Sequence, residues 1–356
     1  MQMFRSFYRQ HQISVKLGGF LGFIVVIASL YFFVLSGSIF GNAAADATGQ
    51  GSPTQIGPEN SPISTAALPT LPPEPSPSPI PPLLPPRYHV TMHPNLAYAT
   101  SGAVDRRLDL CEPVGAPGLR PGVILIHDIG TKVEDKSVYT SLCSLLASQG
   151  FVAAAINYRK YPNVWPAQLE DAQLSVRWLR ANAGKYKLDP TRLCSWGDSA
   201  GAHLAVFLGV LGTSYPGDES GLLSNQSPRV SCVVDDFGYV DLTTLPNTAF
   251  WQGAFGFMFG QDADGKSVAT PALLHKASPI FYVDAQSAPM LLVHGALDVV
   301  VSPGQSRELQ QKLQQATVPV SYMSYAGGHD FSGVAPQQLN AIKRQIISYL
   351  TAQEHP

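Results

Sequence analysis

Short apolar runs alternate with helical patterns along the C-terminal part of the sequence, and this alternation limits the folds that the chain can adopt. The runs span Gly122–Ile126, Phe151–Ile156, Arg192–Ser195, Val230–Val234 and Met290–Val293. Runs this short and continuous are typical of strands buried on both faces. The helical patterns span Tyr139–Gln149, Trp165–Ala183, Ala200–Leu211, Ser302–Gln315 and Leu339–Leu350. This order predicts an α/β fold, with a mostly parallel central sheet flanked by helices.

Residues 1–40 have the pattern of a membrane anchor. Arg5, Arg9 and Lys16 make the start basic, and Leu17–Phe40 carries no charge. A helix needs roughly 20 apolar residues to cross a bilayer, whereas the apolar core of a cleaved signal peptide is about 7–15 residues long. We expect one transmembrane helix, with the basic start in the cytoplasm and the rest of the chain outside it. The small residues Ala43–Ala45 leave cleavage and secretion open as the alternative.

Residues 41–86 predict a disordered linker, because this segment is small, polar and increasingly rich in proline. Such a composition cannot bury a core and favours the extended polyproline II conformation. At about 3.1 Å per residue, the linker would hold the following domain away from a membrane. Residues 87–356 then form one folded domain, a usual size for an α/β protein.

Composition excludes several classes of partner. The formal net charge of −2 gives no basic surface for a nucleic acid. The cysteines have no metal-ligand spacing, so we predict neither a metal nor a cofactor. Cys111, Cys143, Cys194 and Cys232 are expected to be buried unpaired thiols. One disulfide is possible if the domain lies outside the cytoplasm, but the sequence does not show which two cysteines would form it.

The segment Gly197–Gly201 (Gly-Asp-Ser-Ala-Gly) carries the strongest chemical signal. It follows the short run Leu193–Trp196 and opens a helical run. A Gly-x-Ser-x-Gly sequence between a strand and a helix is typical of a nucleophile elbow, whereas the same letters elsewhere often occur by chance. The turn exposes the hydroxyl of Ser199, and the helix N-terminus contributes positive partial charge there. Ser199 is therefore the candidate nucleophile.

A serine nucleophile needs a histidine base and an acid that orients it, and in this setting they follow in the order Ser, acid, His. His329 lies in a Gly-rich loop after the strand-like Val318–Tyr325 and is the candidate base. We expect His203 to pack within the helix after Ser199 and His294 to be structural. His275 and His355 have no comparable setting.

Asp298 is the candidate acid, because it follows the apolar strand Met290–Val293 in a loop. Asp241 follows the preceding strand and is the alternative. Asp198 is interpreted as structural, since its position in the elbow directs it away from the nucleophile.

The charge that develops on a reacting carbonyl oxygen needs backbone N–H donors. Ala200, directly after the nucleophile, supplies one. The other candidates are Asp128 and Ile129, in the early loop after the strand Gly122–Ile126. We expect His127 to brace this loop rather than to transfer protons.

Short segments in order between Tyr98 and Leu350 resemble one known group, the hormone-sensitive-lipase-like and feruloyl-esterase-like (BD-FAE) α/β-hydrolases. They are Leu108–Leu110, Asn157–Arg159, Pro166–Asp171, Arg177–Asn182, Asp189-Pro190, Gly197–His203, Ser278-Pro279, His294-Gly295 with Asp298, and Gly328-His329. The resemblance implies an α/β-hydrolase fold and a serine esterase that cleaves small carboxylic esters through an acyl-enzyme. It also implies Ser199, Asp298 and His329 as the catalytic triad. It leaves the particular ester and the oligomeric state open.

The early loop departs from this family, which usually carries His-Gly-Gly-Gly there. Here Asp128 and Ile129 occupy the two middle positions, and isoleucine in particular resists a positive φ. This departure favours a catalytically weakened binding module as the alternative function. A peptidase of the same fold is a third alternative, disfavoured because such peptidases usually carry a large extra domain. The aromatic stretch Phe250–Phe259 lies where these folds place cap elements, and could line a pocket or simply pack.

Overall fold

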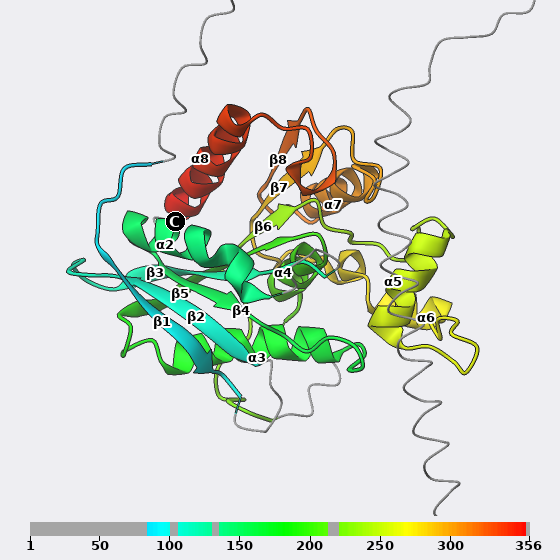
Figure 1. Ribbon diagram of the computed structural model, residues 1–356, viewed down its shortest axis with the longest axis horizontal. Coiled ribbons are helices and arrows are strands. Elements are labelled where there is room, and N and C mark those ends of the chain that lie inside the picture. The colour runs from blue at the N-terminus through cyan, green and yellow to red at the C-terminus, as the bar shows by residue number, and fades with distance from the viewer. Residues whose placement is uncertain (1–83, 100–105, 130–134, 213–220, 354–356) are drawn as a thin grey trace, which may run out of the picture. The chain divides into compact units, whose positions relative to one another are not determined.

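The computed structural model describes residues 84–99, 106–129, 135–212 and 221–353 (Figure 1). Their strands form one sheet in the order β1-β2-β4-β3-β5-β6-β7-β8. The strands are β1 (Val90–Ala97), β2 (Arg107–Pro113), β3 (Arg120–Ile126), β4 (Val152–Ile156), β5 (Leu188–Asp198), β6 (Cys232–Asp236), β7 (Met290–Gly295) and β8 (Val320–Tyr325). From β4 to β8 every neighbouring pair is parallel, and only the pairs β1–β2 and β2–β4 are antiparallel. The predicted α/β class with a mostly parallel sheet is confirmed.

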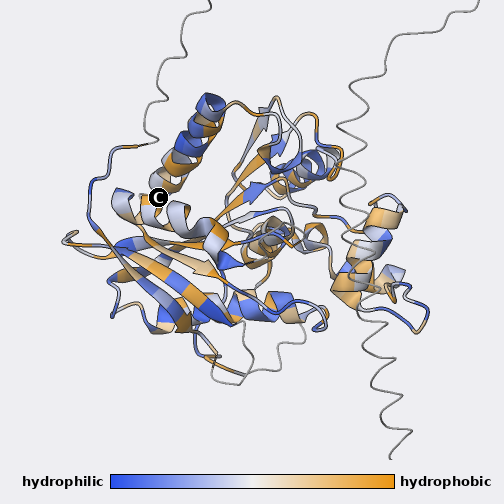
Figure 2. Ribbon diagram, in the orientation of Figure 1, coloured by the Kyte–Doolittle hydropathy of each residue, from blue (hydrophilic) through white to orange (hydrophobic). Residues whose placement is uncertain are grey.

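Helices cover both faces of this sheet. The helices of the described residues are α2 (Thr140–Gln149), α3 (Ala167–Ala181), α4 (Ala200–Val210), α5 (Ala249–Phe259), α6 (Pro271–Lys276), α7 (Gly304–Gln315) and α8 (Pro336–Ala352), with the short 3-10 helices η1 (Lys136–Tyr139), η2 (Pro279–Tyr282) and η3 (His329–Phe331). Of these, α5 and α6 lie to the side of the sheet (Figure 1). Figure 2 shows hydrophilic and hydrophobic residues together along α3 and α8, as expected for helices with one side on a core.

The central strands are apolar throughout because each of their faces meets a separate core. In β3, Ile124 and Ile126 belong to the core that includes residues of α3, α4 and α7. Val123 and Leu125, which point the other way, belong to the core that includes residues of α2 and α8. All four of these side chains are fully buried. This packing explains why the sequence shows continuous rather than alternating apolar runs.

The expectation that the cysteines are unpaired is wrong. Cys111 of β2 is bonded to Cys143 of α2, and Cys194 of β5 is bonded to Cys232 of β6. The Cα atoms of the two pairs lie 5.8 and 4.6 Å apart, within the range that a disulfide spans. Cys194 and Cys232 are directly paired in the parallel register of β5 and β6. That register is set by the fold, which is why the spacing along the sequence did not reveal it.

The predicted anchor at residues 1–40 lies outside the described residues, as does the predicted linker up to residue 83, so both stay predictions. At the end of that linker, the Gln149 side chain donates to the Pro85 carbonyl at 2.9 Å. Within the residues that the structure describes, none of the helices is both long and apolar enough to cross a membrane.

Candidate active site

Ser199 lies at a sharp turn between the end of β5 and the start of α4. Its φ of 50° and ψ of −114° are unusual for a residue with a side chain, as is typical of a strained functional turn. Two backbone hydrogen bonds hold this conformation. The Ser199 N–H donates to the carbonyl of Asp236 at 2.9 Å, and the His203 N–H donates to the carbonyl of Ser199 at 3.0 Å.

The two glycines of the elbow are required by close backbone approach. A Cβ on Gly201 would lie 1.9 Å from the carbonyl oxygen of Ile126, at the end of β3. A Cβ on Gly197 would lie 2.3 Å from the carbonyl oxygen of Gly201. The absence of side chains at these two positions therefore lets α4 start directly against β3 and β5.

His329 follows β8, and the structure brings it to the nucleophile. Its Nε2 lies 3.0 Å from the Ser199 Oγ, and its Nδ1 lies 2.7 Å from Oδ2 of Asp298. Because the carboxylate only accepts, Nδ1 carries the proton, and Nε2 is free to accept the hydroxyl proton. The Phe237 ring packs against the imidazole in a T-shaped contact, with the ring centroids 4.8 Å apart. The side chain of His329 is only 11% exposed.

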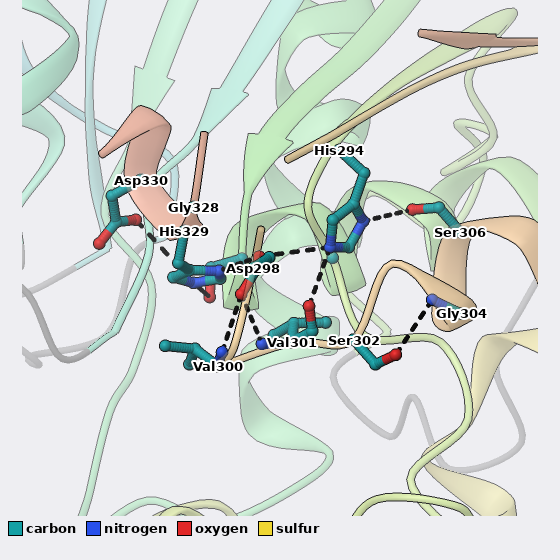
Figure 3. Close-up of polar contacts among 12 residues, drawn as sticks. His294, Asp298, Val300, Val301, Ser302, Gly304, Ser306, Gly328, His329 and Asp330 are labelled. Atoms are coloured by element: carbon teal, nitrogen blue, oxygen red, sulfur yellow. Dashed lines mark hydrogen bonds and ion pairs between the residues drawn. The ribbon is translucent and has the colours of Figure 1, made fainter. Parts of the chain in front are cut away.

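Asp298 follows β7 and is fixed by the loop that contains it (Figure 3). Its Oδ1 accepts hydrogen bonds from the backbone N–H groups of Val300 at 2.8 Å and Val301 at 2.9 Å. Its Oδ2 faces His329, so one carboxylate oxygen binds the backbone of the loop and the other binds the imidazole. Asp241, the alternative acid, instead accepts from the backbone and hydroxyl of Thr243 at 2.8 and 2.6 Å.

The structure adds His294 to this group. Its Nε2 lies 3.0 Å from the Val301 carbonyl and 3.3 Å from the Asp298 carboxylate, and its Nδ1 lies 2.7 Å from the hydroxyl of Ser306 (Figure 3). Since two acceptors face Nε2, that nitrogen carries the proton and Nδ1 accepts from Ser306. Sequence reasoning treated His294 as structural and missed this contact. The available signal was its position four residues before Asp298.

The pKa values of Asp298 and His329 are shifted in the directions that proton transfer from Ser199 requires. Burial alone would raise the pKa of Asp298, but hydrogen bonds from His294 and His329 hold it well below the usual range, so the carboxylate is ionised. Burial alone would lower the pKa of His329. The hydrogen bond and charge of Asp298, with the charges of Asp330 and Asp128, outweigh burial and raise the pKa. The imidazole is therefore a stronger base than a free one.

The early loop carries Asp128 directly to the elbow. Oδ1 of Asp128 accepts a hydrogen bond from the backbone N–H of Ala200 at 3.1 Å. The predicted bracing role of His127 is confirmed, because its Nδ1 lies 2.6 Å from the Asp128 carbonyl and its ring stacks on Tyr158. Burial and the neighbouring charge of Asp198 raise the pKa of Asp128 to about 8. The amide expected to bind a developing oxyanion thus already has a partner.

The remaining polar side chains around the elbow have structural contacts. Asp198 accepts from the hydroxyl of Tyr139, in line with its structural interpretation. Asp236 accepts from the indole Nε1–H of Trp196 at 2.8 Å. The Nε2 of His203 lies 2.8 Å from the Ala277 carbonyl, so this residue packs within the core as expected. Among the described residues, no group of three or more His, Cys, Asp or Glu side chains is arranged to hold a metal ion.

The chain is similar in sequence to known proteins over more than half of its length. Esterase LipQ of Mycobacterium tuberculosis is 31% identical over 209 residues, which is 58% of this chain and 49% of that protein. Esterase LipC of the same organism is 29% identical over 197 residues, or 54% of this chain and 48% of that protein. The chain therefore spans about half the length of these curated relatives.

A solved structure, a truncated form of a carbohydrate esterase from gut microbiota, superimposes with a TM-score of 0.62 and 26% identity. The match covers 75% of this chain and 97% of that one. The family model of BD-FAE matches residues 108–313, more than half of the chain. This chain belongs to the BD-FAE family of α/β-hydrolases.

Proposed function

We propose that the folded domain is a serine hydrolase that cleaves small carboxylic esters, with Ser199 as nucleophile, His329 as base and Asp298 as the orienting acid. The observation that carries the proposal is the continuous hydrogen-bonded path from Ser199 Oγ through His329 to Asp298, at 3.0 and 2.7 Å. Three side chains from three different loops meet in the order that proton transfer needs.

In the first half-reaction, the Ser199 Oγ attacks the carbonyl carbon of the ester while its proton passes to Nε2 of His329. Asp298 stabilises the resulting imidazolium through the Nδ1–H bond. The tetrahedral intermediate collapses when the bond to the alcohol oxygen breaks, and His329 gives its proton to that oxygen. An acyl group is then bonded to Ser199, and the alcohol leaves.

In the second half-reaction, a water molecule replaces the alcohol. His329 accepts a proton from the water as its oxygen attacks the acyl carbon, and then returns a proton to the Ser199 Oγ as the carbon–oxygen bond breaks. The carboxylic acid leaves and the free hydroxyl is restored. Ala200 and the backbone N–H groups of Asp128 and Ile129 are the proposed donors to the oxyanion in both halves.

The relatives support an ester as substrate, because LipQ, LipC and the structural neighbour all bear esterase names. The alternative function, a catalytically weakened binding module, is favoured by the hydrogen bond that Asp128 makes with the Ala200 amide. The two functions differ in turnover, which makes them separable by one kinetic experiment.

We also propose that the domain works outside the cytoplasm, held by a single membrane helix at Leu17–Phe40 or secreted after cleavage near Ala45. Two disulfides support this location, because disulfides persist in oxidising compartments. Protease added to intact cells or spheroplasts should release an active domain by cutting within residues 41–83. A domain that stays intact until the membrane is broken would contradict the proposal.

The ester function is tested with purified protein and p-nitrophenyl esters of increasing acyl length, compared with aminoacyl p-nitroanilides. We expect hydrolysis of the esters, a preference for one range of acyl lengths and little cleavage of the anilides. The Ser199→Ala variant is the matched control and should reduce ester hydrolysis by several orders of magnitude. Ester hydrolysis that is equal in the two proteins would refute Ser199, and preferred cleavage of the anilides would favour a peptidase.

A further inference from the structure

One contact in the active site has no place in the proposed reaction, the hydrogen bond from Ala200 to Asp128. The N–H of the residue after the nucleophile is the donor that receives a developing oxyanion, at about 2.7–3.1 Å. Oδ1 of Asp128 lies 3.1 Å from that nitrogen. A carboxyl oxygen of the protein thus holds the place that a substrate's carbonyl oxygen needs.

We propose that the Asp128 side chain is a gate on the oxyanion hole, which closes it in the free protein and must swing away before Ser199 is acylated. This inference rests on the proposed function and adds a specificity-determining residue to it. An ester that gains little binding energy away from its carbonyl group displaces Asp128 poorly. An ester with larger groups binds the protein more tightly, and part of that binding energy offsets the displacement of Asp128.

The gate moves as a side chain, because the backbone directly before it is held in place. Ile126, two residues earlier, packs so closely on the elbow that Gly201 has no room for a Cβ. Between them, His127 is buried, stacks on Tyr158 at 4.6 Å and accepts on its carbonyl from the Tyr158 hydroxyl at 2.7 Å. Asp128 itself is only 7% exposed. Rotation of its short side chain is therefore the small movement that frees the Ala200 N–H.

Asp128 acts on the site in two ways, and an experiment has to separate them. It occupies the Ala200 N–H, and it also places a carboxyl group near His329. Asparagine at position 128 keeps an oxygen that can accept from Ala200 but removes the ionisable group. Alanine or glycine removes both. Asp330 is the matched control for charge alone, because it also acts electrostatically on His329 while its side chain is 46% exposed.

The test uses the full-length protein in detergent and measures two rates. One is the rate at which a fluorophosphonate probe phosphonylates Ser199, and the other is the rate at which p-nitrophenyl acetate acylates it. We expect Asp128→Ala and Asp128→Gly to react about 10- to 100-fold faster than the wild type, as part of the roughly 10²–10³-fold value of one oxyanion donor is recovered. Asp128→Asn should stay within about threefold of the wild type, because an amide oxygen accepts the same hydrogen bond. Asp330→Asn should not give a tenfold gain.

The acceleration should also be larger for p-nitrophenyl acetate than for the longest ester that the wild type hydrolyses well. Circular dichroism and thermal melting of each variant show that it is folded before rates are compared.

Three results would overturn the gate. The alanine and glycine variants could be no faster than the wild type, which would mean that Asp128 does not obstruct the site. The asparagine variant could be as fast as the alanine variant, which would assign the effect to charge. Alanine could slow the reaction with rescue by asparagine, which would make the side chain a donor to the oxyanion.

Failure of the gate can be told apart from failure of the proposed function. If neither the wild type nor any variant reacts at Ser199, the proposed function itself fails. If the wild type reacts and the variants are no faster, only the gate is refuted.

Discussion

The Nε2 of His294 lies 3.3 Å from Oδ2 of Asp298, the same oxygen that faces His329 at 2.7 Å. His294 of β7 and His329, which follows β8, therefore share one carboxylate oxygen, while backbone amides hold the other. His294 is fully buried in β7, so the sheet fixes its position directly. The acid is thus held by the rigid end of a strand rather than by its loop alone.

Replacement of the two candidate acids should have very different effects. Asp298→Asn removes the charge that stabilises the imidazolium of His329, and we expect kcat to fall by on the order of 10³–10⁴. Asp241→Asn should leave kcat within about threefold, because its carboxylate accepts only local hydrogen bonds from Thr243 among the contacts described. Ester hydrolysis by both variants checks this ranking, and the reverse ranking would move the acid to Asp241.

Ester hydrolysis should depend on pH through His329. The base must be neutral to accept a proton, so kcat/KM falls as the pH falls through the pKa of His329. Asp298, Asp330 and Asp128 together raise this pKa against the opposing effect of burial. We therefore expect an acidic limb with a midpoint above about 6.5, the ordinary value for histidine.

Asp330→Asn provides the matched test of that profile. Removing one negative charge disfavours the imidazolium, so the acidic limb should move to lower pH with little change in the plateau rate. The measurement is kcat/KM for one ester across the neutral and mildly acidic range. A limb that stays in place in the variant would show that the charge of Asp330 does not act on His329.

The glycines of the elbow should be irreplaceable for reasons of space. Gly201→Ala places a methyl group 1.9 Å from the Ile126 carbonyl, and we expect a loss of about 3 kcal/mol or more in the free energy of unfolding, with loss of activity. Gly184→Ala is the control, since a Cβ there meets nothing within 4 Å, and should change stability by less than about 1 kcal/mol. Urea unfolding of both variants decides, and equal stability would contradict the close approach.

The two disulfides should contribute measurably to stability. They close segments with sequence separations of 32 and 38 residues, for which roughly 2–4 kcal/mol each is expected. Thiol titration of the denatured protein should find no free thiols before reduction and four afterwards. Reduction should lower the urea midpoint. Four free thiols in unreduced protein purified from its native compartment would refute both bonds.

Short sequence patterns predicted the central strands of the sheet but not the strands at its N-terminal edge. The strands β3, β4, β6 and β7 were expected because burial on both faces produces continuous apolar runs. The antiparallel strands β1 and β2 were not expected. β1 lies at the edge of the sheet, and its exposed and partly buried residues give no continuous apolar run.

Some parts of the candidate site could be predicted from the sequence, and others only from the folded structure. Ser199, Asp298 and His329 were identified from short strand–loop patterns, each readable within a few residues. The contact between Asp128 and Ala200 joins residues 72 positions apart, so only the folded chain reveals it. The disulfides likewise depend on which strands and helices become neighbours, which the fold decides.

The location of a covalent adduct tests the central claim most directly. The wild-type protein is treated with a fluorophosphonate probe, digested, and analysed by mass spectrometry of the resulting peptides, in parallel with Ser199→Ala. We predict one modified peptide, with the phosphonate on Ser199 in the sequence Gly-Asp-Ser-Ala-Gly, and no modified peptide in the variant. An adduct on another serine, or equal labelling of the Ser199→Ala variant, would contradict the assignment of Ser199 as the nucleophile.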